Sequence, residues 1–274
     1  MNRASFTEQE SPILLSVIRE RTPDAAIAII KNSIVSGAGG FDLHLSTLEN
    51  QYLNETDLAK IISSTVKPVL ALHYNVDYHK RPTGLSDEAR MKQLLTAVRA
   101  GAAAIDMQGY TFEEDMDNAL NGCGELFVRA RPKQVTMRKE TIAKQCELIN
   151  EVHSLGAQVV LSTHTGCMMT AEEAVSLAQT LEKRGADVVK IIAKAEKEED
   201  VAECFRTVIA LKKVLKTKFT YHLEGKVGKL TRIVAPMLGS YMAFCFEHYT
   251  ESSNFEQCHL KTLANAFRTL QWRN

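Results

Sequence analysis

Short apolar segments alternate with longer amphipathic segments along nearly the whole chain. The apolar segments do not alternate with polar residues and are rich in Val, Ile, Leu and Ala, which is typical of parallel strands buried on both faces. They predict eight strands: Ile13–Ile18, Phe41–Leu45, Pro68–His73, Ala102–Met107, Ala157–Thr163, Ala186–Ala193, Phe219–Leu223 and Ser240–Phe246. The segments between them predict eight helices: Asp24–Ser36, Glu55–Thr65, Asp87–Arg99, Thr141–Ser154, Ala171–Arg184, Glu198–Leu215, Lys229–Ala235 and His259–Leu270.

Several predicted helices carry local start and stop signals. Thr170 before Ala-Glu-Glu is typical of an N-cap with a capping glutamate, and Gly156 and Gly185 stand where helices commonly end. Eight strand–helix units in 274 residues favour an α/β fold, a (β/α)8 TIM barrel in a single domain spanning 1–274. A doubly wound open sheet is the alternative, but no GxGxxG follows the first strand and no GxxxxGK[ST] is present.

The connection between the fourth and fifth strands is longer than a turn and one helix require. Residues 111–139 contain TFEED, GCGE and VRARPK before the next helix begins. We therefore expect an enlarged connection here, which forms a hairpin, an extra helix or an oligomer contact.

Composition narrows the class of protein. The chain has 33 basic and 33 acidic residues and a formal net charge of zero, so we expect no nucleic-acid or membrane partner. No apolar run approaches the ~20 residues that span a bilayer. The polar start MNRASFTEQESP lacks the pattern of a signal peptide, and the six cysteines form no CxxC pair. We expect a reduced, cytoplasmic protein without a metal or other cofactor.

Polar residues gather at the predicted strand ends. In a barrel the reactive groups lie at the C-terminal ends of the strands. The period of two places Asp42 with His44, and His222 with Glu224, on one face of their strands. Burying this many polar groups against helices would be costly, which favours the barrel lumen. The residues at these ends are Asp42, His44, His73, Tyr74, Asp106, Gln108, Ser162, His164, Lys190, His222 and Glu224.

Lys190 and His164 are the leading candidates for chemistry. Lys190 lies inside the strand-like sequence GADVVKIIA, so its amine is either paired or kept neutral by desolvation. A neutral amine there can form a Schiff base with a ketone; a structural lysine paired with a carboxylate such as Asp106 is the alternative. His164 ends the preceding strand and is suited to general acid/base catalysis, with a hydrogen-bonded core histidine as the alternative.

Several motifs together resemble the type I 3-dehydroquinate dehydratases, which are aldolase-like barrels that act through a lysine Schiff base. The similarity is best from about residue 157 to the end, with a weaker similarity over 40–107. The motifs that carry it are VVLSTH followed by TAEEA, GADVVKIIA, EGKVGKLTRI, PMLGSYMAF and SNFEQ. Each match is modest, but their order and spacing are fairly specific.

The resemblance implies a role for each matching residue. Lys190 would form the imine and His164 would move the proton, while Arg232 would bind a carboxylate through its planar fork. Ser253 and Gln257 would close over the same end of the substrate. Asp106 would help to position the base region, and relatives suggest a homodimer.

The chain departs from the family pattern at the end that recognises hydroxyl groups. Asp42 and His44 stand where the family has a glutamate and an arginine, and His73 or Tyr74 where it has an arginine. Asp77 supplies the acidic partner of the catalytic histidine if a shift of one residue is allowed.

On the seventh strand, His222 and Glu224 replace methionines, and Glu224 is a candidate second acid/base. The sequence thus predicts a Schiff-base hydro-lyase on a carboxylated cyclic ketone such as 3-dehydroquinate. A small-molecule keto acid is the expected partner, with Asp42, His44, His73, Asp106 and His222 among its binding residues.

Three alternatives remain at this stage. A Schiff-base aldolase or lyase would use the same lysine on another keto acid or a sugar-derived ketone. A metal-dependent barrel would surround a divalent ion with Asp42, His44, His164, His222 and Glu224, although no HxH or HExxH pattern is present. A catalytically inactive barrel would serve as a binding module.

Overall fold

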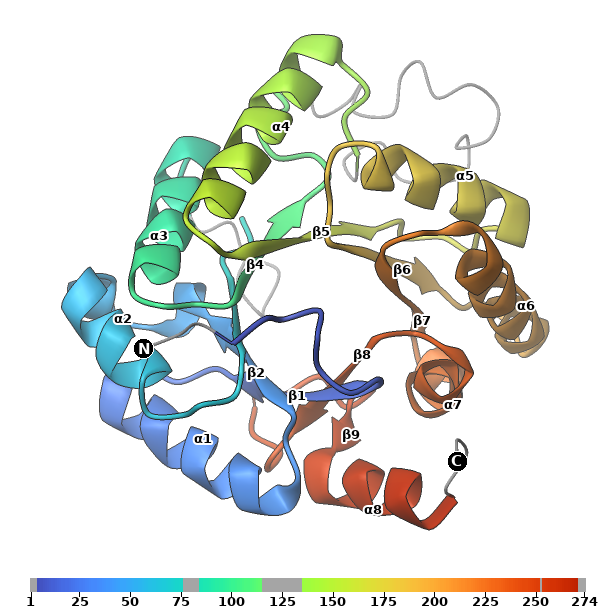
Figure 1. The fold of residues 1–274 in the computed structure, drawn as a ribbon. Helices are drawn as coiled ribbons and strands as arrows, with labels where there is room; N and C mark the ends of the chain where they lie inside the picture. The colour runs from blue at the N-terminus through green and yellow to red at the C-terminus, as the bar shows by residue number, and fades with distance from the viewer. Residues whose placement is uncertain (1–3, 76–83, 115–134, 252, 271–274) are drawn as a thin grey trace. The chain divides into compact units, whose positions relative to one another are not determined.

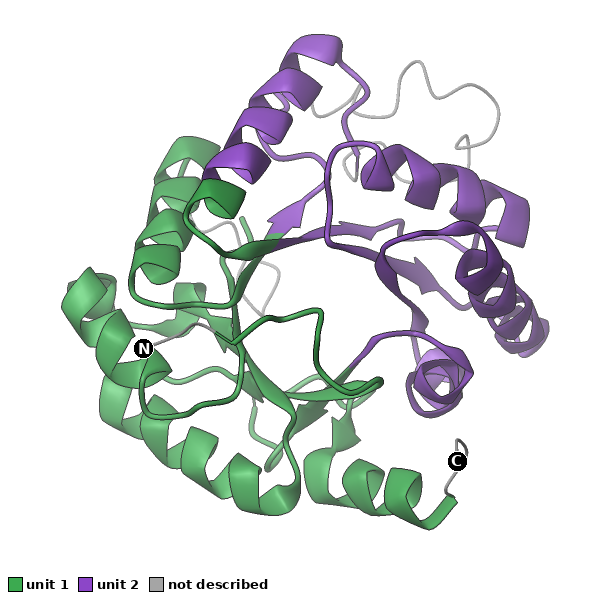
Figure 2. Ribbon diagram, viewed as in Figure 1, with its two compact units in different colours: residues 1–106, 152–158, 243–274 green, residues 107–151, 159–242 purple. Residues whose placement is uncertain are grey.

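Strands and helices alternate along the chain, as the sequence predicts (Figure 1). The structure is a computed structural model that describes residues 4–75, 84–114, 135–251 and 253–270. The chain divides into two compact units, shown in Figure 2. Unit 1 comprises Met1–Asp106, Val152–Gln158 and Ala243–Asn274, and unit 2 comprises Met107–Glu151 and Val159–Met242.

Unit 1 is built on parallel strands. The strand order in this unit is β4-β3-β2-β1-β8-β9, and the pairs β1–β2, β2–β3, β3–β4 and β8–β9 are parallel. The strands are β1 (Ile13–Ile18), β2 (Gly40–His44), β3 (Val69–Leu72), β4 (Ala104–Gln108), β8 (Met242–Phe246) and β9 (Cys258–His259). The helices are α1 (Pro23–Ser36), α2 (Glu55–Ile62), α3 (Asp87–Arg99) and α8 (Leu260–Leu270), with 3-10 turns at Leu45–Thr47 and Asn50–Tyr52.

Unit 2 repeats the same local pattern. Its strands β5 (Gln158–His164), β6 (Val188–Lys194) and β7 (Lys218–Glu224) pair in parallel. Its helices are α4 (Lys139–Ser154), α5 (Ala171–Glu182), α6 (Glu199–Val214) and α7 (Thr231–Leu238), with a 3-10 turn at Val227–Leu230 before α7. The apolar side chains of these strands are buried, which explains their unalternating sequences.

The predicted boundaries agree with the structure to within a few residues. β1 and α3 match their predicted ranges, whereas the two-residue strand β9 was not predicted. Helix α7 was predicted at Lys229–Ala235 but begins at Thr231, because a 3-10 turn occupies its first positions. It also continues through Pro236 to Leu238, with Gly239 as its C-cap, so this proline does not stop the helix.

The predicted capping signals are present. Thr170 and Glu173 form a reciprocal capping box at the start of α5. Gly156 and Gly185 have positive φ angles of 75° and 100°, which L-residues with side chains rarely adopt.

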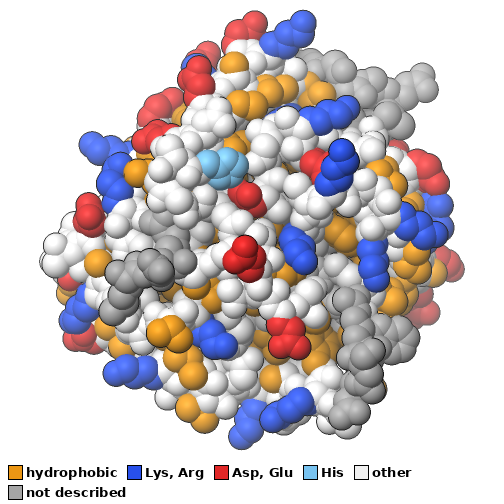
Figure 3. Space-filling view, viewed as in Figure 1, with side chains coloured by type: hydrophobic (Ala, Val, Ile, Leu, Met, Phe, Trp, Pro, Cys, Tyr) orange, Lys and Arg blue, Asp and Glu red, His pale blue; other side chains and the backbone are white. Residues whose placement is uncertain are grey.

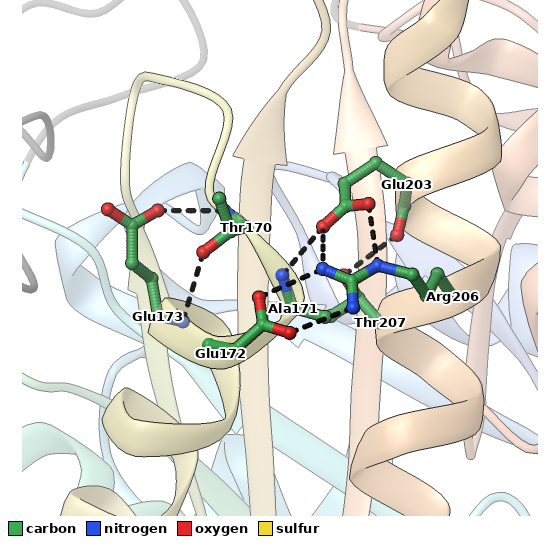
Figure 4. Close-up of polar contacts among 7 residues, drawn as sticks. All are labelled: Thr170, Ala171, Glu172, Glu173, Glu203, Arg206 and Thr207. Atoms are coloured by element: carbon green, nitrogen blue, oxygen red, sulfur yellow. Dashed lines mark hydrogen bonds and ion pairs between the residues drawn. The ribbon is translucent and has the colours of Figure 1, made fainter.

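An ion-pair network joins the start of α5 to α6 (Figure 4). Arg206 donates hydrogen bonds to Glu172 and Glu203, and Glu203 also accepts from the backbone N–H of Ala171 at 2.7 Å. The hydrogen bonds to Arg206 lower the pKa of Glu172 to about 2. The network holds the first turn of α5 against α6. It therefore also supports the position of the loop between β5 and α5.

The two described ends of the 111–139 connection are held by buried polar contacts. Glu113 binds the Thr136 hydroxyl and lies 3.2 Å from Arg138 Nη1. Arg184 donates to the carbonyl oxygens of Thr136 and Gly109. Residues 115–134, on which the prediction of a hairpin, extra helix or oligomer contact falls, lie outside the described residues.

Acidic and basic side chains are interspersed on the face that Figure 3 shows, consistent with the zero net charge. None of the helices in the described part of the chain is long and apolar enough to cross a membrane.

Candidate active site

The register of the unit 2 strands brings the leading candidates onto one face of the sheet. Ser162, Lys190 and Thr220 are lateral partners on β5, β6 and β7. His164 and His222 flank Ile192 in the row two residues further along. Because side chains two residues apart in a strand share a face, Lys190 lies on the same face as both histidines.

This face points away from the helix layer of unit 2. Tyr221, whose side chain has the opposite direction to that of His222, interacts with Thr207 and Cys204 of α6. Burial raises the pKa of the Cys204 thiol to about 12, as expected in an apolar helix–strand interface. Lys190 is 5% exposed and His222 4% exposed, so both are nearly removed from solvent.

The loop after His164 is anchored to the lysine strand. The backbone N–H of Thr165 donates to Ile192 O at 2.9 Å, and the N–H of Lys194 donates to Cys167 O at 3.1 Å. The Thr165 hydroxyl also donates to Cys167 O at 2.8 Å. These bonds fix the chain on both sides of His164, since β5 holds the residues before it.

Arg232 is positioned by a tight glycine turn. Gly225 has a φ of 95°, and a side chain at Gly228 would clash with Leu223, whose Cβ and O atoms lie 2.8 Å from the Cβ position. The Thr231 hydroxyl closes the turn by accepting from Leu223 N at 3.0 Å and donating to Gly228 O at 2.6 Å. Arg232, at the start of α7, therefore lies close to the C-terminal end of β7.

Arg232 and His222 are in direct contact. Arg232 Nη1 lies 2.9 Å from His222 Nε2, and Arg232 is 8% exposed. Burial lowers the pKa of His222 well below its usual range, and electrostatic interactions with Arg232, Lys190 and His164 lower it further. The imidazole of His222 is therefore neutral near neutral pH.

Glu224 stands at the more open end of the same face. Its lateral partner is Lys194, four residues beyond Lys190, and its backbone oxygen accepts from Ala195 N at 3.0 Å. At ~3.3 Å per residue, the level of Glu224 is about 13 Å along the strand from that of Lys190.

Unit 1 gathers a second polar row. His44, Leu72 and Asp106 are lateral partners on β2, β3 and β4, and Asp42 lies two residues before His44 on the same face. His44 Nε2 is 3.3 Å from Asp42 Oδ2. The other carboxylate oxygen of Asp42 is buried and has no hydrogen-bond partner among the residues described.

The end of β3 separates its two candidate residues. The Tyr74 hydroxyl is 3.3 Å from Asp106 Oδ2, so Tyr74 contacts the polar row of unit 1. His73 is 2% exposed and interacts with Gln93 and Arg90 of α3. Burial and the Arg90 charge lower the pKa of His73 to about 4, so it is neutral near pH 7.

Ser253 and Gln257 both lie in the loop before β9 in unit 1 and are nearly buried. Ser253 Oγ accepts from Thr250 N at 2.8 Å, and Tyr249 donates its hydroxyl to Gln257 O at 2.7 Å. Hydrogen bonds between its own residues therefore stabilise the loop. Gln257 Oε1 is buried and has no hydrogen-bond partner in the described part of the chain. Asp77, the expected acidic partner of the histidine, lies outside the described residues.

Arg90 was missed in the sequence. It is fully buried in α3, where it pairs with Asp87 and donates Nη1 to His73 O at 2.6 Å. Its signal was its place on the apolar stripe of the helix, four residues before Leu94.

The described residues contain no group of three or more His, Cys, Asp or Glu side chains that could hold a metal ion.

Comparison with known proteins places the chain in a family. The model of the type I 3-dehydroquinase family matches residues 17–273. A 3-dehydroquinate dehydratase of Desulfotalea psychrophila is 27% identical over 161 residues, and this match spans only 58% of each protein.

Solved structures show the same fold. A 3-dehydroquinate dehydratase from Geobacillus kaustophilus superposes with a TM-score of 0.73 at 12% identity, covering 95% of this chain and 92% of that one. A type I enzyme from Clostridium difficile, with covalently modified comenic acid, gives 0.74 at 16% identity and 98% coverage of both chains. The predicted (β/α)8 barrel is confirmed by these likenesses, and the matched family model establishes that the chain belongs to the type I 3-dehydroquinase family.

Proposed function

We propose that this chain is a Schiff-base hydro-lyase that dehydrates a carboxylated cyclic ketone, with 3-dehydroquinate as the leading substrate. The observation that carries the proposal is the unit 2 register, which sets a buried Lys190 on the same face as His164 and His222. Membership of the type I 3-dehydroquinase family supports the same reaction.

The proposed reaction begins with attack of the neutral Lys190 amine on the ketone carbon. The carbonyl oxygen leaves as water, which gives an iminium ion and makes the neighbouring C–H acidic. His164 removes that proton to form an enamine and then protonates the β-hydroxyl, which leaves as a second water. Hydrolysis of the remaining iminium consumes one water, frees the amine and releases the conjugated ketone, so one water is lost overall.

The remaining residues are proposed to bind and orient the substrate. Arg232 binds the carboxylate, helped by Ser253 and Gln257, because a guanidinium fork matches the geometry of a carboxylate. Asp42 and His44 recognise hydroxyl groups.

Asp106 is proposed to help position the base region, and His73 is proposed to contribute to substrate binding. Glu224, at the open end of the strand face, is proposed as a second acid/base that exchanges protons with solvent.

Trapping the imine tests the proposal. The protein is incubated with 3-dehydroquinate and borohydride, and the modified peptide is mapped by mass spectrometry while the absorbance of the enone product is followed in a parallel sample. We expect product formation and a reduced adduct on Lys190. The control is Lys194→Met, which removes a lysine four residues along the same strand and should leave trapping and turnover unchanged.

Two outcomes contradict the proposal. An adduct on Lys194 instead of Lys190 would move the imine to another residue. No product at high enzyme concentration would exclude 3-dehydroquinate as the substrate, and a panel of other keto acids in the same assay would then separate a different Schiff-base lyase from an inactive barrel.

The quaternary state and location are also proposals. We infer a homodimer in the cytoplasm, supported by exposed Tyr249 and Phe255 and by six cysteines without a paired motif. Light scattering of the purified protein checks the first, because a monomer at micromolar concentration would contradict it.

A further inference from the structure

Two cysteines of unit 1 lie side by side on neighbouring strands. Cys245 of β8 and Cys258 of β9 are lateral partners in the parallel pair that these strands form (Figure 1). Lateral partners direct their side chains to the same face of the sheet. Both residues are buried, and both are thiols in the structure. The other cysteines in the described part of the chain, Cys146, Cys167 and Cys204, all belong to unit 2.

The spacing of neighbouring strands suits a disulfide between these two residues. Adjacent strands lie about 4.8 Å apart, and the Cα atoms of disulfide-linked cysteines are usually about 4.4–6.8 Å apart. The Cβ atoms have to approach by roughly 1 Å, from about 4.5–5.5 Å between lateral partners to about 3.8 Å in a disulfide. β9 comprises two residues and lies at the end of the strand order, so a shift of this size disrupts few hydrogen bonds.

A single aromatic side chain interacts with both thiols. Burial raises the pKa of the Tyr249 hydroxyl, and electrostatic interactions with Cys258 and Cys245 raise it further. The same hydroxyl donates a hydrogen bond to Gln257 O, the residue before Cys258, at 2.7 Å. Because Tyr249 is within reach of both sulfur atoms, its contacts agree with the strand register in placing the two cysteines together.

The surroundings of the two thiols differ in a way that sets the order of their reactions. Cys258 is 8% exposed, whereas Cys245 is fully buried and its Sγ lies 3.8 Å from Ala243 O. Cys258 also lies two residues before the first residue of α8, and a helix N-terminus favours the negative charge of a thiolate. An oxidant therefore meets Cys258 first, and Cys245 is the thiol that resolves the mixed disulfide.

We propose that Cys245 and Cys258 form a site of reversible oxidation, at which a small organic disulfide converts the two thiols to an intramolecular disulfide. The Cys258 thiolate attacks one sulfur of the oxidant, whose S–S bond breaks and releases a first thiolate. The Cys245 thiolate then attacks the Cys258 sulfur and displaces the second thiolate. The protein gives up two electrons and two protons, and the oxidant takes them up and becomes two thiol molecules.

The disulfide joins the two ends of the loop that carries Ser253 and Gln257. Gln257 directly precedes Cys258 in the chain, so the movement of β9 toward β8 also moves Gln257. A consequence for turnover rests on the proposed function, in which Gln257 helps to bind the substrate. Oxidation should then raise KM about threefold or more, because a displacement of about 1 Å weakens a positioned contact. The formation of the disulfide itself does not rest on the proposed function.

Oxidation of the whole chain tests the site without any substrate. The reduced protein is incubated with bis(2-hydroxyethyl) disulfide, and the remaining thiols are alkylated. The products are mapped after cleavage with a glutamate-specific protease, because Glu247, Glu251 and Glu256 separate the two cysteines in the sequence. We expect a peptide pair that joins Cys245 to Cys258 and that dithiothreitol separates.

Single substitutions show which thiols are required. Cys245→Ser and Cys258→Ser should each abolish the cross-link, whereas Cys146→Ser, which removes a partly exposed cysteine of α4, should leave it intact. Oxidation should raise the Tm of the wild type by about 5 °C, because the disulfide closes a short loop in the unfolded chain. Each protein is compared before and after oxidation, so a variant that is less stable when reduced still gives a clear result.

Refolding from urea with the same oxidant gives both thiols full access to it. No cross-link in either the folded or the refolded protein would show that the native geometry does not support the bond. A cross-link that forms only on refolding would show that the folded protein is not a reversible redox site. Either result, a cross-link to a different cysteine, or an unchanged Tm in the cross-linked protein would overturn the inference.

Kinetics with 3-dehydroquinate separate the redox site from the proposed function. If the disulfide forms as expected and neither the reduced nor the oxidised protein dehydrates 3-dehydroquinate, the proposed function fails and the redox site stands. If the reduced protein is active, an increase in KM on oxidation that dithiothreitol reverses would support the effect on the loop. An unchanged KM in the fully oxidised protein would overturn that effect.

Discussion

The two units carry comparable rows of polar side chains with different chemistry. In unit 2 the row His164–Ile192–His222 follows the row that contains Lys190, and in unit 1 the row His44–Leu72–Asp106 follows the row that contains Asp42. Each row places an aliphatic side chain between two polar ones. The difference lies in the charged residue two positions earlier along the strand, which is Lys190 in unit 2 and Asp42 in unit 1.

Under the proposed function, this difference separates the residues that carry out covalent chemistry from those that recognise the substrate. An imine requires an amine with a proton-transfer group beside it, so the residues of unit 2 have few chemical substitutes. Hydroxyl groups of a substrate can be bound by carboxylates, imidazoles or guanidinium groups, so unit 1 can depart from the family pattern and still hold a ligand. The sequence resembles the family motifs around Lys190 and His164 in unit 2, whereas Asp42 and His44 in unit 1 stand where the family pattern has a glutamate and an arginine.

Replacing His164 should have the largest effect among the variants that leave the lysine intact. His164→Gln removes the group proposed to take the proton from carbon, so kcat should fall by about 10²- to 10⁴-fold. Borohydride should still trap an adduct on Lys190, because the amine that forms the imine is unchanged. Steady-state kinetics and trapping on the same preparation check this. A fall of less than tenfold in kcat would assign the proton transfer to another group and would break the contrast between the units.

The positions of the unit 2 residues could be predicted because strand geometry fixes them. The run GADVVKIIA predicted a buried strand, and once β5, β6 and β7 are parallel, the two-residue period sets which side chains share a face. The glycine turn before Arg232 also has a local cause, since Gly225 has a positive φ and Gly228 packs directly on Leu223.

Side-chain partners could not be predicted in the same way. The Arg232–His222 bond depends on how far α7 is shifted by the 3-10 turn before it, and the sequence placed that helix two residues too early. The position of His73 depends on Arg90, a charged residue on a face of α3 whose other residues predict apolar packing. Short-range patterns specify an element and its buried face, but they do not specify which long polar side chain reaches across to it.

In unit 1, His73 should make stability depend on pH. Its pKa is about 4 in the folded protein and 6.5 in the reference state, so the unfolded chain binds more protons between these values. The free energy of unfolding should therefore be unaffected by this group above pH 6.5, fall as the pH drops through the window from 6.5 to 4, and lose at most about 3 kcal/mol. Urea unfolding of wild type and His73→Asn from pH 4.5 to 7.5 measures the difference in slope.

The control for His73 is exposed His248, also in unit 1. His248→Asn should reproduce the wild-type slope, whereas His73→Asn should flatten it even if the variant is less stable at pH 7. Parallel slopes for wild type and His73→Asn would mean that this imidazole is not held neutral by α3.

The smallest expected effect, and the one that sharpens the contrast most, comes from Asp42. Its Oδ1 is buried without a hydrogen-bond partner among the described residues, and an acceptor in that state gains most when a ligand hydroxyl donates to it. Asp42→Asn should raise KM for a hydroxylated substrate about tenfold while leaving borohydride trapping at Lys190 intact. An analogue without that hydroxyl should bind both proteins equally, and Asp24→Asn, an exposed substitution in the same unit, should change neither value. Equal losses for both ligands would make Asp42 a structural residue. A loss of trapping would show that the Asp42 carboxylate takes part in the covalent chemistry. The two rows would then not differ in function as proposed.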